Sequence, residues 1–253
     1  MSQTLSKVNI VTVTYNSIKD IDECVEYLYQ NTGTMETSGN FHYTIVDNGS
    51  KDGTAERLGH LRNSYSMDVV LLNRNTGVSW AHNYVWRNYP GEHYVKLDPD
   101  VRILTKGSID TMAKIADENE SIVGTIGLNV ESRPVPSTEV ELSGIKVIYK
   151  TIGNLGGACI LIPNYVNKIL GYWDVLDRPY GEEDAIYGLK SLGIKRKNIY
   201  LCDYKASLTQ EDLTSEYRKF KDECRKHNVS KDGMYQKRLY EYMKGIRPIY
   251  NNG

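Results

Sequence analysis

The stretch Lys96-Leu97-Asp98-Pro99-Asp100-Val101 places two carboxylates, two residues apart, at the predicted end of a buried strand. It follows the apolar-leaning run His93-Tyr94-Val95. Pro99 should end the strand, because proline has no N–H to give a sheet and favours an extended residue before it. Neighbouring carboxylates repel each other unless a cation lies between them, and Mg²⁺ or Mn²⁺ bound together with substrate phosphates would relieve that repulsion. The stretch therefore fits either a metal and diphosphate site or a solvated Asp-Pro-Asp turn.

Predicted strands and helices alternate ahead of this stretch. The segment Val8–Thr14 is a nearly continuous apolar and β-branched run, as expected of a strand covered on both faces in a parallel sheet. The other strands are predicted over 41–46, 68–72 and 92–97. The helices are predicted over 20–31 and 79–88 and, between them, from after Thr54 through Arg62. Such alternation predicts an α/β fold, with right-handed crossovers and helices on both faces of a mostly parallel sheet.

Polar turns follow three of these strands. They are Thr14-Tyr15-Asn16, Asp47-Asn48-Gly49-Ser50 and Asp98-Pro99-Asp100. In parallel sheets ligands bind beyond the carboxyl ends of the strands, so we expect the three turns to meet there. None contains the glycine-rich signature of a dinucleotide site or a P-loop. The charge of a phosphate bound at this edge would therefore have to be met by a metal.

Two further segments carry polar or glycine-rich patterns after the alternation weakens. The run Gly153-Asn154-Leu155-Gly156-Gly157 leads into a buried strand, where its glycines could let the backbone approach a ligand or could only form a tight turn. Glu182, Glu183 and Asp184 precede a helix predicted over 185–192 and closed by Gly193. These carboxylates could be dipole partners of that helix, or one could be a general base.

The composition is that of an ordinary globular protein, with 40% hydrophobic and 25% charged residues among 253. This length suits one large α/β domain, with or without a small appendage. No apolar stretch is long enough to span a bilayer, and the chain starts without a secretory signal pattern. We therefore expect a soluble cytoplasmic protein, free or peripheral at a membrane. The four cysteines lie far apart, which argues against a zinc site or a disulfide framework.

The charge of the chain is unevenly distributed. Residues 1–189 carry 16 basic and 24 acidic side chains, a net charge of −8, whereas residues 190–253 carry 15 basic and 8 acidic ones, a net charge of +7. A basic tail indicates either an anionic partner or lysine-rich solvated helix faces. The side chains expected on the apolar face of a first tail helix are Leu213, Tyr217, Phe220 and Cys224. A second helix is predicted through Tyr242.

The order of motifs along the chain resembles the family 2 glycosyltransferases, which are inverting nucleotide-sugar enzymes of the GT-A fold. The segments that carry the resemblance are Val11–Asn16, Val46–Thr54, Asn73–Asn83, Asp98–Asp100, Gly171–Asp174 and Glu183–Asp184. Together they cover roughly Val8 to Leu201. The Asp-Pro-Asp form of the metal motif is similar to that of rhamnosyltransferase-like members.

The resemblance implies a donor site, a metal site and a catalytic base. The residues expected at a nucleotide-diphosphate sugar are Thr14, Tyr15, Asn16, Asp47, Asn48, Gly77, His82, Asn83 and Asp98. A Mn²⁺ or Mg²⁺ ion is expected on Asp100 with Asp98. The base is expected to be Asp184, with Glu183 as its neighbour or reserve. The residues expected on the acceptor side are Gly156, Gly157, Trp173 and Asp174, where the indole could offer a flat wall to a sugar ring.

The chain departs from the family pattern at two places. Members commonly carry Arg where His82 stands, so a diphosphate contact there is expected to be weaker or pH-dependent. Many members also place a metal-binding His after the Glu-Asp helix, and Cys202-Asp203-Tyr204-Lys205 contains none. Asp203 could substitute as a ligand, Lys205 could replace some of the cation's charge, or Asp100 and the diphosphate could hold the metal largely alone.

These expectations define a domain plan and a reaction. A GT-A domain is predicted over residues 1–203, with a nucleotide-sugar-binding half (1–100) and an acceptor-binding half (101–203). A basic helical extension is predicted over 204–253. The reaction is a single inverting displacement that moves a sugar to an acceptor hydroxyl, in surface polysaccharide or lipid-linked glycan synthesis. The basic extension would meet an anionic acceptor.

Three alternatives remain open. The acceptor could be a modified DNA base, which would have to leave the base stack to reach Asp184. The chain could also be a non-catalytic module that binds carbohydrate or nucleic acid. A sugar-phosphate nucleotidyltransferase is disfavoured, because it should carry a glycine-rich basic loop where Thr14-Tyr15-Asn16-Ser17 stands.

Overall fold

The computed structural model describes residues 7–32, 41–89, 91–130, 137–150, 158–176, 180–209, 219, 222–224 and 234–249. Its strands are β1 (Val8–Thr14), β2 (Phe41–Asp47), β3 (Asp68–Leu71), β4 (His93–Leu97), β5 (Val101–Ile103), β6 (Val123–Val130), β7 (Ser137–Leu142), β8 (Ile145–Lys150), β9 (Cys159–Pro163) and β10 (Lys197–Leu208). Its helices include α1 (Ile21–Asn31), α3 (Thr54–Leu61), α4 (Val78–Asn88), α5 (Ser108–Glu118), α6 (Asn164–Leu170), α7 (Glu183–Gly193) and α9 (Met234–Met243). No helix within these ranges has both the length and the apolar character that crossing a bilayer requires.

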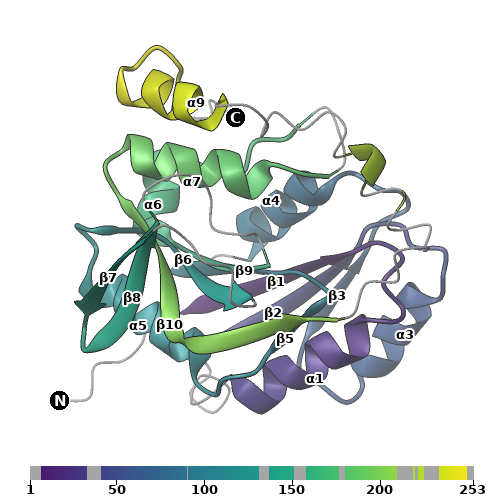
Figure 1. Ribbon diagram of the computed structural model, residues 1–253. Coiled ribbons are helices and arrows are strands. Elements are labelled where there is room, and N and C mark those ends of the chain that lie inside the picture. The colour runs from purple at the N-terminus through teal and green to yellow at the C-terminus, as the bar shows by residue number, and fades with distance from the viewer. Residues whose placement is uncertain are drawn as a thin grey trace.

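The strands form one ten-stranded sheet in the order β3-β2-β1-β4-β9-β6-β10-β8-β7, with β5 paired to β10 (Figure 1). Its N-terminal half is parallel, as predicted, because β1 pairs with both β2 and β4, and β2 pairs with β3. Strand β9 then runs antiparallel between β4 and β6. The parallel half brings the carboxyl ends of β1, β2 and β4 to one edge.

Helices cover both faces of the sheet. Helices α1, α3 and α5 pack on one face, where Leu28, Leu58 and Met112 join one apolar core. Helices α4, α6 and α7 pack on the other face, as Figure 1 shows, around a second core that contains Trp86 and Trp173. Because side chains alternate along a strand, β4 contributes to both cores.

The C-terminal helix α9 lies against α7 on the outer side of the molecule (Figure 1). Its Tyr242 is buried, and a Cβ added at Gly193 would come within 2.9 Å of the Tyr242 Cβ. Gly193 is therefore needed for close packing of α9. Gly193 is the last residue of α7, as the sequence predicted when it placed the end of the helix there, and the positive φ of the turn that follows, 63°, belongs to Lys195.

The structure adds elements that the sequence pattern did not reveal, among them β5, β7, α6 and β10. Strand β10 continues to Leu208, so the predicted domain boundary after residue 203 falls inside a strand. Residues beyond that boundary pair with β6 and β5, which ties the end of β10 into the main sheet. The division into a GT-A domain and a helical extension stays a prediction. Of the predicted first tail helix, Leu213, Tyr217 and Phe220 lie outside the described residues, whereas residue 219 and residues 222–224, which include Cys224, are helical.

Candidate active site at the carboxyl edge of the sheet

The turns after β1 and β2 are joined by hydrogen bonds. The Asp47 carboxylate accepts from the Thr14 hydroxyl at 3.1 Å and from the Ser50 N–H at 3.0 Å. The Ser50 hydroxyl in turn accepts from the Asn16 N–H at 2.8 Å, and Asn16 has a left-handed backbone with φ of 55°. Tyr15 lies in the same turn. Four of the residues predicted at the donor thus form one structured edge.

The loop that begins α4 is held against this edge. The Asn48 side-chain carbonyl accepts from the Thr76 N–H at 2.8 Å, and its amide donates to the Asn75 Oδ1 at 2.9 Å. The Gly77 N–H also donates to the Asn75 Oδ1, at 2.9 Å. A Cβ on Gly49 would lie only 2.8 Å from a backbone atom of Arg74, so only glycine allows the two loops to pack this closely. Asn48 and Gly77 therefore belong to one pre-formed surface.

The Asp-Pro-Asp turn is anchored at both ends. The Asp98 N–H donates to the Ala158 carbonyl at 2.8 Å, and the Asp100 carbonyl accepts from the Thr209 N–H at 2.8 Å. The Lys96 ammonium donates to the Asp98 Oδ1. Residues two apart in a strand share a face, so Lys96 places a cation beside Asp98 on the face covered by α4 and α7.

The start of α7 brings two more carboxylates to the same place. Glu183 is buried, and its carboxylate accepts from the Gly181 N–H at 3.1 Å. Burial raises the pKa of Glu183 to about 7, the Asp184 carboxylate adds to the rise, and the Lys96 ammonium opposes it. Burial disfavours the charged form of Lys96, but Asp98, Glu183 and Asp184 outweigh that effect and raise its pKa. These electrostatic couplings join the Asp-Pro-Asp turn to the start of α7.

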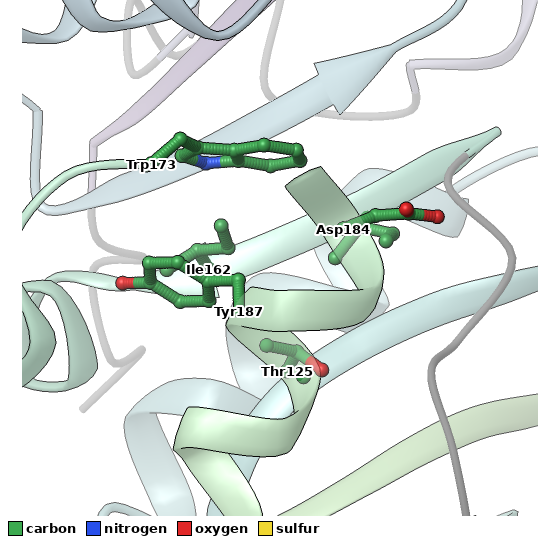
Figure 2. A pocket seen from close by; sticks show the side chains of 7 residues that line it. Thr125, Ile162, Trp173, Asp184 and Tyr187 are labelled. Atoms are coloured by element: carbon green, nitrogen blue, oxygen red, sulfur yellow. The ribbon is translucent and has the colours of Figure 1, made fainter. Parts of the chain in front are cut away.

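Asp184 lines a small pocket between α7 and the sheet. Figure 2 shows its carboxylate on α7, with the Trp173 indole across the pocket and Tyr187 one turn further along the helix. The residues that line the pocket are Thr125, Ile160, Ile162, Trp173, Asp184, Tyr187 and Gly188. Asp184 is partly exposed, whereas Glu183 is buried. Of the two adjacent carboxylates, Asp184 is therefore the more accessible to a substrate.

Three residues predicted to touch substrates are held inside the molecule. Trp173 is buried and stacks on His82, with ring centroids 5.7 Å apart. The Asn83 amide holds the Trp173 backbone twice, donating to its carbonyl at 2.8 Å and accepting from its N–H at 3.0 Å. Burial, and then the Lys96 charge, hold the pKa of His82 well below its usual range. These contacts argue against a diphosphate contact by His82 or Asn83, and against Trp173 as an open wall for a sugar.

Asp174 has a structural partner. The Lys190 ammonium, on α7, donates to its Oδ1 at 2.8 Å, which ties the segment after Trp173 to the helix. Both members of the pair have little exposure, 4% for the Lys190 side chain and 23% for that of Asp174. The two other residues predicted on the acceptor side, Gly156 and Gly157, lie outside the described residues.

Comparison with known proteins agrees with this geometry. The model of the family named glycosyl transferase family 2 matches residues 9–157, more than half of the chain. The chain belongs to glycosyl transferase family 2. Among curated proteins, YfnE of Bacillus subtilis (strain 168), described as an uncharacterized glycosyltransferase, is 24% identical over 117 residues, which are 46% of this chain and 29% of YfnE.

Solved glycosyltransferase structures share the fold of this family 2 member. The 1–349 fragment of TarS from S. aureus superposes with a TM-score of 0.60 at 21% identity, over 80% of this chain and 60% of that one. The mannosyltransferase PcManGT from Pyrobaculum calidifontis, solved with GDP-Man and Mn²⁺, superposes with a TM-score of 0.67 at 15% identity, over 95% of this chain and 70% of that one. The predicted GT-A fold is confirmed by these likenesses.

The carboxylates at this site of the family 2 chain suit a cation that is bound partly by the protein and partly by a substrate. Within the described residues, no group of three or more His, Cys, Asp or Glu side chains could hold a metal alone. Asp98 and Asp100 supply carboxylate oxygens at the sheet edge, and Mg²⁺ or Mn²⁺ often binds to one or two carboxylates plus substrate phosphates. The residues present therefore fit a divalent ion that arrives with a diphosphate.

Lys96 is the residue at this site that the sequence reading missed. It is a buried cation in a strand whose residues are all buried, and it lies two residues before Asp98. That pattern was visible in the sequence. Its proximity to Glu183 and Asp184, which are 87 and 88 positions away, was not.

Proposed function

We propose that this chain transfers a sugar from a nucleotide-diphosphate donor to an acceptor hydroxyl, with inversion at the anomeric carbon. The observation that supports the proposal best is the meeting of the Asp-Pro-Asp turn with the start of α7, through the electrostatic coupling of Asp98, Glu183 and Lys96. Membership of glycosyl transferase family 2 is consistent with it. A module that only binds its ligand would not need both a buried carboxylate, Glu183, and an accessible one, Asp184, beside the proposed diphosphate site.

In the proposed reaction the acceptor oxygen forms a bond to the anomeric carbon while the bond from that carbon to the diphosphate oxygen breaks. The electron pair of the broken bond leaves with the diphosphate. Asp184 takes the proton of the acceptor hydroxyl, because it is the accessible carboxylate of the α7 pair, and buried Glu183 acts as its neighbour. Asp47 and the turn after β1 hold the nucleoside, and Asp98 contacts the ribose or the donor sugar. A divalent ion on Asp100 would supply positive charge for the leaving diphosphate.

The proposed acceptor is a surface polysaccharide or a lipid-linked glycan, met by the protein in the cytoplasm or at a membrane surface. Helix α9 and the turn that follows it support an anionic acceptor, since Lys237 in the helix and Lys244 in the turn are exposed. A modified DNA base is a polyanionic alternative that the same cations would favour. PcManGT was solved with GDP-Man and TarS with UDP-GlcNAc, so both nucleotides should be included in a donor screen.

The test is donor turnover. The full chain is incubated with a panel of nucleotide-diphosphate sugars and Mn²⁺, and release of the nucleoside diphosphate is followed with and without glycan, lipid-linked and DNA acceptors. Release that depends on Mn²⁺ and increases with one acceptor class supports the proposal. Donors that bind, as seen by thermal shift, and remain intact with every acceptor would instead indicate a binding module.

A further inference from the structure

Lys96 is a buried cation in the middle of the sheet. It lies on β4 between Val11 of β1 and Ile160 of β9, and only 3% of its side chain is exposed. Its ammonium lies 5.9 Å from the centre of the Trp173 ring and donates to the Asp98 Oδ1. A buried charge is costly unless it is paired, so the surrounding carboxylates are what make this position tolerable.

The charged groups that face Lys96 come from two elements. Asp98 follows on the same strand, and Glu183 and Asp184 come from the start of α7. His82, from α4, is close enough for its pKa to be lowered by the Lys96 charge, and its burial keeps it neutral. Lys96 is thus a cation that three carboxylates share, and its ammonium is hydrogen-bonded to Asp98.

We infer that Lys96 is a positioning residue that gives the two aspartates of the Asp-Pro-Asp turn different tasks. Its ammonium occupies the Asp98 Oδ1 and lowers the negative charge near the metal site, so that a divalent ion is held by Asp100 and Asp98 is kept for the donor's hydroxyls. The inference rests on the proposed function, because it assumes that the turn receives a metal with its substrate.

The molecule contains a matched pair for comparison. Lys190 and Asp174 have side-chain exposures of 4% and 23%, almost the same as the 3% and 28% of Lys96 and Asp98. Lys190 lies in the last turn of α7, about two helical turns away from Glu183 and Asp184 in the first. Loss of Lys190 therefore removes a buried lysine–aspartate pair without removing the cation of the acidic cluster.

The experiment is a calorimetric titration of the full chain with Mn²⁺ alone, at fixed pH and ionic strength. Lys96→Met removes the cation that repels the metal and releases Asp98, so Mn²⁺ should bind about 10-fold or more tightly than in the wild type. Adding Asp98→Asn to Lys96→Met should abolish that gain. The matched control, Lys190→Met, should bind Mn²⁺ within about twofold of the wild type. A purely structural role of Lys96 predicts weaker metal binding instead of tighter binding.

Unchanged or weaker Mn²⁺ binding by Lys96→Met would overturn the inference, as would a gain that survives Asp98→Asn. If Lys96→Met does not fold by circular dichroism, Lys96→Gln retains a donor for Asp98 and should also bind Mn²⁺ more tightly. Lys96→Arg keeps the charge and should stay near the wild-type affinity, so a gain there would contradict the inference. Since the readout is Mn²⁺ alone, it stays interpretable if no donor is turned over, and failure of the proposed function is seen separately in the donor screen.

Discussion

The two ends of helix α7 each lie beside an ion pair between a buried lysine and a partly exposed aspartate, but they differ in what surrounds the pair. At the first turn, Lys96 and Asp98 lie with Glu183 and Asp184, and burial raises the pKa of Glu183 to about 7. At the last turn, Lys190 holds Asp174 close to the site where Tyr242 of α9 packs on Gly193. At the last turn the ion pair therefore joins two segments of the chain. At the first turn the ion pair lies within a cluster of carboxylates, and burying that cluster lowers the stability of the fold.

The largest effect is expected at the first turn of α7. Asp184→Asn should lower the rate of sugar transfer by about 10²-fold or more while donor binding is retained, since general bases usually contribute about 10²–10⁴. Single-turnover transfer and calorimetric donor binding measure the two quantities. Asp68→Asn, the same substitution on the distant strand β3, is the control and should leave both unchanged. If Glu183→Gln loses transfer and Asp184→Asn does not, the base is Glu183.

A loss of affinity is expected at the Asp-Pro-Asp turn. Asp100→Asn should weaken Mn²⁺-dependent binding of the nucleoside diphosphate by about 10-fold or more, because a carboxylate ligand opposite the diphosphate is removed. Titration with the nucleotide in the presence of Mn²⁺ and in EDTA provides the comparison. Equal affinity of the wild-type chain in the two buffers would show that the diphosphate needs no metal here.

The raised pKa of Glu183 predicts a pH-dependent cost of folding. An acid whose folded pKa lies above its unfolded value favours folding at low pH, and this contribution is lost as the pH rises from about 4.5 to about 7. Glu183→Gln removes the titration. The free energy of unfolding of this variant should therefore rise relative to the wild type between pH 5 and pH 8, by on the order of 1–3 kcal/mol. Urea unfolding across that range, without metal, measures it, and parallel pH curves would show that Glu183 titrates normally.

The smallest effect is expected on the outer surface of α9. Replacing Lys237 and Lys244 with Gln should raise the apparent KM for an anionic acceptor a few-fold at low salt and little at high salt, because exposed charges are screened. The matched control replaces two other exposed lysines with Gln: Lys106, just before α5, and Lys114, within it. Helix α5 packs on the opposite face of the sheet (Figure 1). The same acceptor kinetics at both ionic strengths would mean that α9 only completes the fold beside the last turn of α7.

The sequence by itself determined the layered fold and the edge where the site lies. Strand β1 has the bounds that its nearly continuous apolar and β-branched run predicted, because such a run is a local signal. Asp98 and Asp100 lie at the end of β4 because Pro99 has no N–H for the sheet. The buried strand after the glycine-rich run was predicted, but its antiparallel direction was not, since pairing direction depends on which strands meet. Strand β10 was not predicted.

Only the tertiary structure decided which of the predicted site residues are buried against other parts of the chain. Asn83 and Trp173 are 90 positions apart in the sequence, yet the amide of one holds the backbone of the other, and His82 is buried beside them. Lys96 likewise interacts with the charges of Glu183 and Asp184 only because the fold brings the start of α7 near β4. Motif spacing identifies the types of residue a site needs. Burial and charge pairing, which decide whether a side chain binds a ligand or supports another residue, depend on contacts between distant segments.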